Sequence, residues 1–274
     1  MRAAVFEALV WGCLTTSACQ SPPAPTSEVV VFDSGELLLQ GVLWKPAGPG
    51  PFPAVLFNHG SGRDYSEQIA ALGPLFTGRG YAFFMPYRRG HGLSAEQAEW
   101  IGSQLDNAEA AGGQTLWSQV MTQQLRGPHL ADQLAALSWY ERQPFVDRDR
   151  LYIAGNSFGG IQTVLVAAET DRVRAVVDFA GAALTWSRSP DLREAMTAAA
   201  RSARVPIMFV QAENDADTTP SRELAAAMAA AGKPHRLKIY PPFGETAEDG
   251  HSFGYFGGDV WIDDILEFFA DNSH

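Results

Sequence analysis

The sequence predicts an α/β protein built on a mostly parallel, doubly wound sheet with helices on both faces. Short apolar runs of strand length alternate with helix-length segments over most of the chain. Most of these runs are nearly continuous in apolar residues, which suits parallel strands that are buried on both faces. The 274 residues are 46% hydrophobic, which is enough for one sizeable core.

The elements are expected in a regular order along the chain. Residues 28–32 and 37–44 predict an opening antiparallel pair, joined by a polar turn at 33–35. The parallel strands are then expected at residues 54–58, 81–85, 151–155, 173–179, 206–211 and 237–240. The helices between and after them are expected at residues 66–76, 115–141, 158–169, 221–231 and 259–270.

Residues 1–27 differ from the rest and are interpreted as a leader and tether ahead of one domain at 28–274. A mostly apolar stretch is followed by small residues before Cys19, and then by a polar, proline-rich segment. This pattern is typical of a secretory signal with a lipoprotein-type cysteine, although Glu7 and Thr16 depart from it. We therefore expect an exported protein, either anchored to a membrane through lipidated Cys19 or free in the periplasm or outside the cell. A loose extension on a cytoplasmic protein is the alternative.

Charge and cysteine content exclude several classes of protein. The formal net charge of -11 disfavours nucleic acid as a partner, because such binders usually need a face rich in Lys and Arg. Both cysteines, Cys13 and Cys19, fall in the leader. A disulfide, a thiolate metal site and a cysteine nucleophile are therefore excluded from residues 28–274. No stretch outside the leader has the roughly 18 consecutive apolar residues that a membrane span needs.

A candidate nucleophile lies at the end of the apolar run 151–155. Residues 155–159 read Gly-Asn-Ser-Phe-Gly, a Gly-x-Ser-x-Gly pattern between an expected strand and an expected helix. A serine on such a tight turn has a strained backbone, and the glycines on either side omit the Cβ atoms that would clash there. Ser157 is therefore expected to be a nucleophile. A helix N-cap is the alternative, but a cap does not need flanking glycines.

A serine nucleophile needs a general base and an orienting acid, and both follow later in the chain. Carboxylates come directly after the expected strand 206–211, where α/β sheets place their sites, and His251 lies between the last strand and the closing helix. The candidate acids are Glu213, Asp215 and Asp217, and the competing histidines are His59, His91, His129, His235 and His274.

Taken together, these segments resemble the α/β-hydrolases of the dienelactone-hydrolase-like group and are similar also to prolyl-oligopeptidase-type catalytic domains. The resemblance covers most of residues 28–270. Dienelactone hydrolases proper carry cysteine at the position of Ser157, and this departure favours plain ester hydrolysis. The resemblance rests on FNHGSG at 57–62, PYRRGHGLS at 86–94, VDRDRL at 146–151, GNSFGG at 155–160, END at 213–215 and GH at 250–251.

The resemblance implies roles for individual residues. The order Ser157, Asp215, His251 is that of an α/β-hydrolase triad, with Asp215 chosen because residues 213–215 match the family's acidic turn. Asp217 is then a turn-capping or surface carboxylate. The backbone amides of Phe158 and Ser61 are expected to form the oxyanion hole.

The resemblance also implies roles for residues around the site. His59 is expected to anchor its loop by hydrogen bonds, and Arg88, Arg89 and His91 to brace the active-site loops. A small lid-like insertion is expected at about residues 95–128. The candidate pocket walls are Trp100, Trp117 and Trp186, for which a plain core role is the alternative.

The sequence thus predicts a serine hydrolase that cleaves a small-molecule carboxylic ester through an acyl-enzyme, without cofactor or metal. A peptidase or amidase of the prolyl-oligopeptidase type is the nearest alternative. Those peptidases usually carry a β-propeller domain, for which these 274 residues leave no room. A non-catalytic surface binding protein on the same fold is a third hypothesis, which the complete set of Ser157, Asp215 and His251 disfavours.

Overall fold

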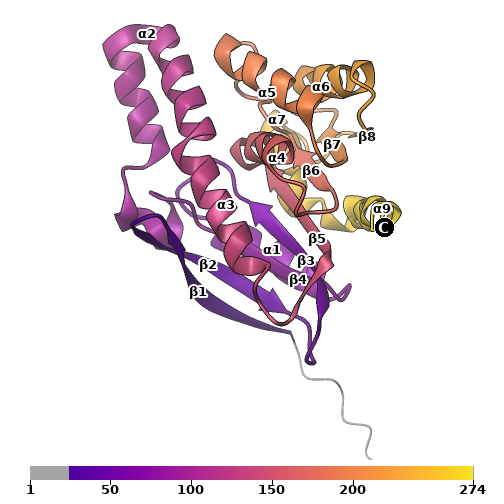
Figure 1. The fold of residues 1–274 in the computed structure, drawn as a ribbon. Helices are drawn as coiled ribbons and strands as arrows, with labels where there is room; N and C mark the ends of the chain where they lie inside the picture. The colour runs from indigo at the N-terminus through magenta and orange to yellow at the C-terminus, as the bar shows by residue number, and fades with distance from the viewer. Residues whose placement is uncertain (1–24, 274) are drawn as a thin grey trace, which may run out of the picture.

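A mixed β-sheet forms the centre of the molecule (Figure 1). The computed structural model describes residues 25–273, so the predicted leader and Cys19 lie outside the described residues. Within this range the sheet has eight strands in the order β1-β2-β4-β3-β5-β6-β7-β8, and all pairings from β4 to β8 are parallel. The strands are β1 (Thr26–Ser34), β2 (Leu37–Lys45), β3 (Phe52–Asn58), β4 (Ala82–Pro86), β5 (Val146–Asn156), β6 (Val176–Phe179), β7 (Ile207–Ala212) and β8 (His235–Tyr240).

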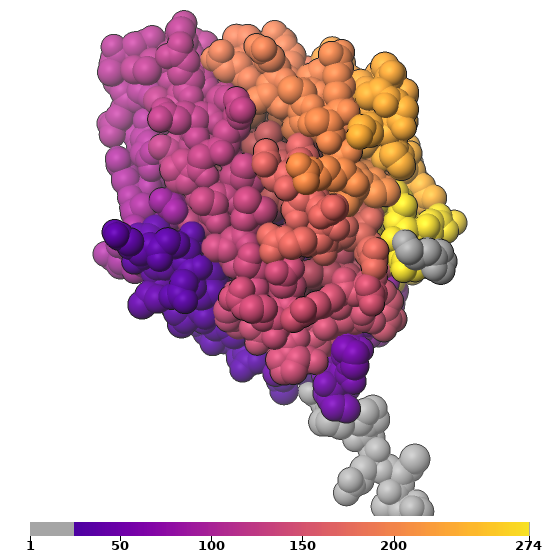
Figure 2. Space-filling model, in the orientation of Figure 1, coloured from indigo at the N-terminus to yellow at the C-terminus, as the bar shows by residue number. Residues whose placement is uncertain are grey.

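Helices cover both faces of the sheet. They are α1 (Ser66–Thr77), the 3-10 helix η1 (Gly92–Gln97), α2 (Ile101–Arg126), α3 (Pro128–Tyr140), α4 (Phe158–Glu169), α5 (Pro190–Ser202), α6 (Thr219–Ala230), α7 (Ala247–His251), α8 (Phe253–Phe256) and α9 (Gly258–Asp271). Helices α2 to α6 pack one apolar core against one face, while α1, α8 and α9 pack a second core against the other. Figure 2 shows α2, α3 and α5 closing over the face turned toward the viewer. The predicted doubly wound architecture is confirmed.

The strand order reverses direction between β3 and β5. The chain passes from β3 to β4 on one side and then returns to place β5 on the other side of β3. Loops that leave the carboxyl ends of neighbouring strands at such a point diverge and leave a crevice, where ligands of open α/β sheets bind. Asn58 and Asn156 end these two strands, so the segments that begin at His59 and Ser157 start side by side.

The antiparallel hairpin of β1 and β2 forms one edge of the sheet and sets where the described chain starts. Thr26 pairs with Lys45, and β2 in turn pairs antiparallel with β4, so that Trp44 faces Phe83 near the amino end of β4. Thr26 therefore lies at the edge of the sheet opposite the carboxyl ends of the parallel strands (Figure 1).

The structure corrects the helix predicted at residues 115–141. The single helix predicted at 115–141 is divided, because Gly127 has a non-helical backbone and Pro128 starts α3 at a position that needs no amide donor. Helix α2 begins much earlier, at Ile101, and folds back on itself at Gly113, where φ is 63° (Figure 1). This helical hairpin occupies the region of the predicted insertion.

Helix α5 was missed altogether. Its signals were present, since Pro190 opens it and its apolar side chains recur at helical spacing, with Leu192, Met196 and Ala200 buried. Among residues 25–273, no helix is both long and apolar enough to cross a membrane.

Candidate active site

Ser157 lies on a sharp turn between β5 and α4. Its backbone has φ 59° and ψ -118°, and its amide donates to the Phe179 carbonyl oxygen on β6 at 2.8 Å. A non-glycine residue with positive φ is strained, and such strain is common at functional sites. A Cβ atom on Gly159 would lie 2.0 Å from the Asn58 carbonyl oxygen. Only glycine there allows α4 to start directly against the end of β3.

Three predicted residues form one hydrogen-bonded chain. The Oγ of Ser157 lies 2.8 Å from Nε2 of His251, and Nδ1 of His251 lies 2.9 Å from Oδ1 of Asp215. An ionised carboxylate only accepts hydrogen bonds, so Nδ1 carries the imidazole hydrogen and Nε2 is left to accept the serine proton. The Asp215 side chain is fully buried, whereas 17% of the His251 side chain is exposed. This arrangement can take a proton from the serine hydroxyl while holding the imidazole in one tautomer.

Asp215 and Asp217 have different surroundings. Both oxygens of Asp215 are held, Oδ1 by the Ala216 amide at 2.6 Å and Oδ2 by the Gln211 side-chain amide at 2.7 Å. Asp217 instead accepts the Thr219 amide at 2.8 Å, in the first turn of α6. Its carboxylate therefore caps a turn, and it makes no hydrogen bond to a histidine within residues 25–273.

We call residues 213–217 and 241–251 the histidine arm. His251 ends the short helix α7, which Thr246 and Asp249 open with a reciprocal capping box. Asn214 joins the two parts of the arm, since its side chain bonds both the amide and the carbonyl of Phe243 and also the Thr246 carbonyl oxygen. No role was predicted for Asn214 from the sequence. These contacts join residues about thirty positions apart in the chain, so no local sequence pattern predicts them.

Residues 59–62, which we call the 59–62 loop, run beside the turn at Ser157, since a Cβ on Gly60 would lie 3.6 Å from the Asn156 carbonyl oxygen. The Gly60 amide donates to the Tyr255 hydroxyl at 2.8 Å, and the Gly62 amide donates to the Tyr65 hydroxyl at 2.6 Å. The Ser61 amide, like that of Phe158, meets no acceptor within the part of the chain that the structure describes. The segments that carry these two amides lie beside each other, because a Cβ on Gly159 would lie 2.7 Å from the His59 carbonyl oxygen. Pairs of unpaired amides from two segments can stabilise an oxyanion.

The 59–62 loop is held from its buried side by residues that the sequence analysis treated as braces. Nη1 and Nη2 of Arg88 donate to the carbonyl oxygens of His59 and Gly60 at 2.7 and 2.6 Å. His59 accepts the Arg88 amide at Nε2 and donates from Nδ1 to the Gly60 carbonyl oxygen. Arg89 differs, because it makes a bidentate bond to Asp132 on α3 and no hydrogen bond to the 59–62 loop within residues 25–273. The expected anchoring of this loop by hydrogen bonds is present.

A buried carboxyl group lies beside the turn. Asp178 on β6 is fully buried and accepts only the Gly181 amide, at Oδ1, within residues 25–273. Burial raises the pKa of Asp178 to about 7, because the carboxylate loses its hydration and the one hydrogen bond from the Gly181 amide offsets only part of that loss. Its Oδ1 would lie 2.2 Å from a Cβ on Gly160, so the carboxyl leaves room for no side chain larger than that of glycine at this position of α4.

The three predicted pocket tryptophans have different surroundings. Trp100 donates from Nε1 to the Ser61 carbonyl oxygen at 2.8 Å, and the Arg63 guanidinium stacks on its ring at 4.0 Å. Trp117 is buried under Arg188, and Trp186 is buried with its Nε1 bonded to a glutamate on α6. Of the three, Trp100 is the one that touches the 59–62 loop.

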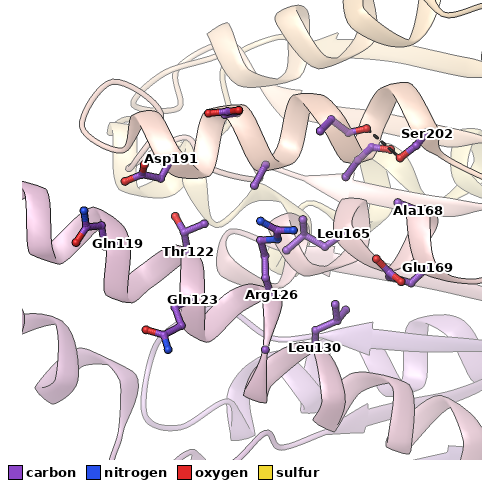
Figure 3. Close-up of a pocket in the computed structure, with 15 residues that line it drawn as sticks. Gln119, Thr122, Gln123, Arg126, Leu130, Leu165, Ala168, Glu169, Asp191 and Ser202 are labelled. Atoms are coloured by element: carbon purple, nitrogen blue, oxygen red, sulfur yellow. Dashed lines mark hydrogen bonds between the residues drawn. The ribbon is translucent and has the colours of Figure 1, made fainter.

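A separate hollow of about 810 Å³ lies between α2, α3, α4 and α5. Figure 3 shows Arg126 extending from the end of α2 toward Leu165 on α4, with Thr122 also on α2 and Asp191 on α5. Leu165 follows Ser157 by eight residues, or about 12 Å along a helix. None of the residues that line the hollow belongs to the Asp215–His251–Ser157 chain.

The fold and the arrangement around Ser157 define an α/β-hydrolase. Residues 39–255 match the family model described as the dienelactone hydrolase family, and the chain belongs to that family. The family predicted from the sequence is confirmed.

The individual relatives and solved structures described next share only 18–25% sequence identity with this chain. A Bacillus subtilis protein named "Uncharacterized peptidase YtmA" is 25% identical over 182 residues, which cover 64% of this chain and 61% of YtmA. A Klebsiella pneumoniae structure provisionally described as a dienelactone hydrolase has a TM-score of 0.66 and 20% identity, covering 90% of this chain and 99% of that one. The acylaminoacyl peptidase of Pyrococcus horikoshii has a TM-score of 0.67 and 18% identity, covering 92% of this chain and 42% of the peptidase. The chain thus spans less than two thirds of the length of YtmA.

Proposed function

We propose that the protein is a serine hydrolase that cleaves a carboxylic ester through an acyl-enzyme. The observation that carries this proposal is the continuous hydrogen-bonded chain from Asp215 through His251 to Ser157. Ser157 attacks the ester carbonyl carbon while its proton passes to Nε2 of His251, and the carbonyl π pair becomes an oxyanion. The amides of Phe158 and Ser61 stabilise that charge. Asp215 holds the imidazole and stabilises the imidazolium.

Collapse of the oxyanion breaks the bond to the leaving alcohol, which takes the proton from His251 and departs. Water then attacks the acyl-enzyme, with His251 again as base, and releases the carboxylic acid and the free Ser157 hydroxyl. These steps use no metal and no cofactor. An ester is the less demanding substrate for this machinery, since an alkoxide leaves more easily than an amine anion.

A peptidase or amidase is the second candidate. It is supported by the likeness to YtmA and to the acylaminoacyl peptidase, whose names describe peptidases. The same residues would act in the same steps, with an amine as the leaving group. A binding protein that has kept the fold without activity is a third possibility, which the intact hydrogen-bonded chain disfavours.

One experiment separates the three functions. A fluorophosphonate is used to titrate the protein, which is then assayed on acyl esters of graded chain length and on aminoacyl anilides. We expect stoichiometric labelling and turnover of esters, and we expect Ser157→Ala to lose the label, with kcat lower by roughly three or more orders of magnitude. Turnover of anilides at rates matching the esters would favour the peptidase. Labelling that persists in Ser157→Ala would contradict the mechanism.

We further propose that the protein is exported and attached to a membrane through lipidated Cys19, on the strength of the sequence pattern before that residue. Two acyl chains give stable anchoring where one is marginal. The expected result is membrane partitioning and uptake of labelled palmitate, both lost in Cys19→Ser. Unprocessed protein in the cytoplasm would contradict this proposal.

A further inference from the structure

Arg88 carries a buried charge without a carboxylate partner. Its side chain is 2% exposed, and no salt bridge to it forms within residues 25–273. Its Nε also has no hydrogen-bond partner there. The neighbouring Arg89 differs in each respect, because it is partly exposed and pairs with Asp132.

Such a charge is unfavourable for folding. An ion moved out of water loses several kcal/mol of solvation, which attraction to a counter-ion normally offsets in part. Burial lowers the pKa of Arg88 to about 10, so the guanidinium remains charged at neutral pH. An unpaired buried ion that is retained at this cost points to a functional role rather than to packing alone.

The surroundings supply little negative charge to offset this cation, with Asp132 the carboxylate whose charge reaches it. Three buried histidines, His59, His91 and His129, lie in one cluster with Arg88. Burial, and next the charge of Arg88, lower the pKa of each of them, to about 3 for His91, so all three are neutral near pH 7. Asp132 is near, but its carboxylate is already bonded by Arg89 and Ser34.

Arg88 contacts the backbone that presents one proposed oxyanion donor. Its Nη2 holds the Gly60 carbonyl oxygen at 2.6 Å. That carbonyl and the Ser61 amide belong to the same planar trans peptide, in which the N–H bond points opposite to the C=O bond. A carbonyl fixed toward Arg88 therefore aims the Ser61 amide away from the buried side of the loop.

Arg88 also lies against the residue that presents the other donor. The centre of its guanidinium is 4.8 Å from the centre of the Phe158 ring, which His129 contacts edge-on from another direction. The cation thus contacts both segments that carry the proposed oxyanion donors, through the Gly60 carbonyl oxygen and the Phe158 ring. At this depth, charges interact more strongly than in water.

We propose that Arg88 is a positioning residue that holds the Ser61 amide in its direction and supplies the positive potential behind the oxyanion. The proposal rests on the proposed serine hydrolase mechanism. Arg88 forms and breaks no covalent bond. It favours the step in which the carbonyl π pair moves onto oxygen, because negative charge then develops in front of a buried cation. The ground-state ester is neutral and gains little from the same potential.

The test compares binding of the transition state with binding of the ground state. It uses an ester that the wild type hydrolyses and the trifluoromethyl ketone with the same acyl group, whose adduct with Ser157 carries an oxyanion. Arg88→Met removes the charge, and Arg88→Lys keeps the charge but lacks the planar fork. Arg89→Lys is the matched control, because it makes the same change one residue away, at the bond to Asp132.

For Arg88→Met we expect kcat and affinity for the ketone to fall together by roughly 10²–10³, the size of losing one oxyanion donor, with KM changed less than about threefold. We expect Arg88→Lys to lose about tenfold in both, and Arg89→Lys to stay within about threefold of wild type, with any loss in stability only. A purely structural role would lower stability and raise KM without this selective loss of ketone affinity.

Each outcome has one interpretation. If the fluorophosphonate labels wild type and Arg88→Met binds the ketone as wild type does, the role of Arg88 is wrong while the serine hydrolase proposal stands. Absence of labelling in wild type would contradict the proposed function itself. Should Arg88→Met not fold, the two lysine variants decide, and equal ketone affinity in Arg88→Lys and Arg89→Lys would overturn the proposal.

Discussion

The histidine arm and the 59–62 loop reach Ser157 from opposite sides of β5 and are held by different chemistry. The arm, which follows β7 and β8, is fixed by neutral amides and turn caps close to solvent, as at Asn214 and Thr246. The loop, which follows β3, is fixed by the buried Arg88 and the hydroxyl of Tyr255. The part proposed to relay protons thus lies close to water. The part proposed to bind the oxyanion is hydrogen-bonded to a buried cation.

The largest expected effect lies in the histidine arm. Asp215→Asn keeps the size of the side chain but can favour the wrong imidazole tautomer, which in a serine protease lowers kcat about 10⁴-fold. We expect a loss of that order, measured as kcat on the same ester. Asp217→Asn is the control, because an asparagine oxygen can still accept the Thr219 amide, and it should stay within about tenfold, or about 1.4 kcal/mol. The reverse ranking would make Asp217 the acid of the arm.

The next effect concerns Asp178, beneath the turn where the two regions meet. Its pKa is about 7 when folded and near the ordinary aspartate value of 3.8 when unfolded, so the folded state holds the proton more tightly. The free energy of unfolding should therefore fall as pH rises from about 4 to about 7. At about 1.4 kcal/mol per pKa unit, the fall is at most about 4 kcal/mol.

Asp178→Asn cannot ionise, so it should lose this part of the pH dependence. Urea unfolding of both proteins at pH 5 and pH 8 measures it, with the variant gaining on wild type at the higher pH. An equal difference in stability at the two pH values would contradict the shifted pKa.

A smaller effect is expected in the 59–62 loop. Tyr255→Phe removes the acceptor of the Gly60 amide and leaves a buried donor unpaired, which costs about 1–3 kcal/mol. We expect a loss of stability of that size by urea unfolding, together with a kcat about tenfold or more below wild type. Tyr140→Phe is the control, because the Tyr140 hydroxyl is buried without a partner among residues 25–273 and its removal should not destabilise. Unchanged kcat in Tyr255→Phe would mean that the loop does not depend on its buried anchors.

The smallest effect tests the solvent side of the same loop. Trp100→Phe removes one hydrogen bond, from Nε1 to the Ser61 carbonyl oxygen, which contributes about 0.5–1.5 kcal/mol. The expected kcat is lower by at most about tenfold, with KM nearly unchanged. If Trp100→Phe lowered kcat more than Tyr255→Phe, the loop would be held chiefly from its exposed side, and the contrast with the histidine arm would fail.

Most of the structure that could be predicted from the sequence was indicated by local residue patterns. Continuous apolar runs indicated the parallel strands, and the glycines around Ser157 indicated the sharp turn because backbone strain there demands particular residues. The break between α2 and α3 had a local signal too, at Gly127 and Pro128, which the helical pattern on either side concealed.

The supports of the site could not be predicted in the same way. Tyr255 meets Gly60 across 195 residues of chain, and the burial of Arg88 depends on how loops from several strands pack together. An arginine in a polar turn reads as an exposed residue, since arginine is almost never fully buried. Only the folded arrangement distinguishes Arg88 from Arg89, although the two are adjacent and chemically identical.

The position of Thr26 decides which way Ser157 faces when the protein is attached to a support through the segment ahead of β1. Thr26 starts β1 at the edge of the sheet opposite Ser157. Any chain, surface or carrier joined ahead of Thr26 is therefore attached on the side of the molecule opposite Ser157. If the proposed function holds, a protein immobilised through this end would keep the carboxyl ends of its parallel strands turned outward, and large substrates would reach Ser157 without passing the support.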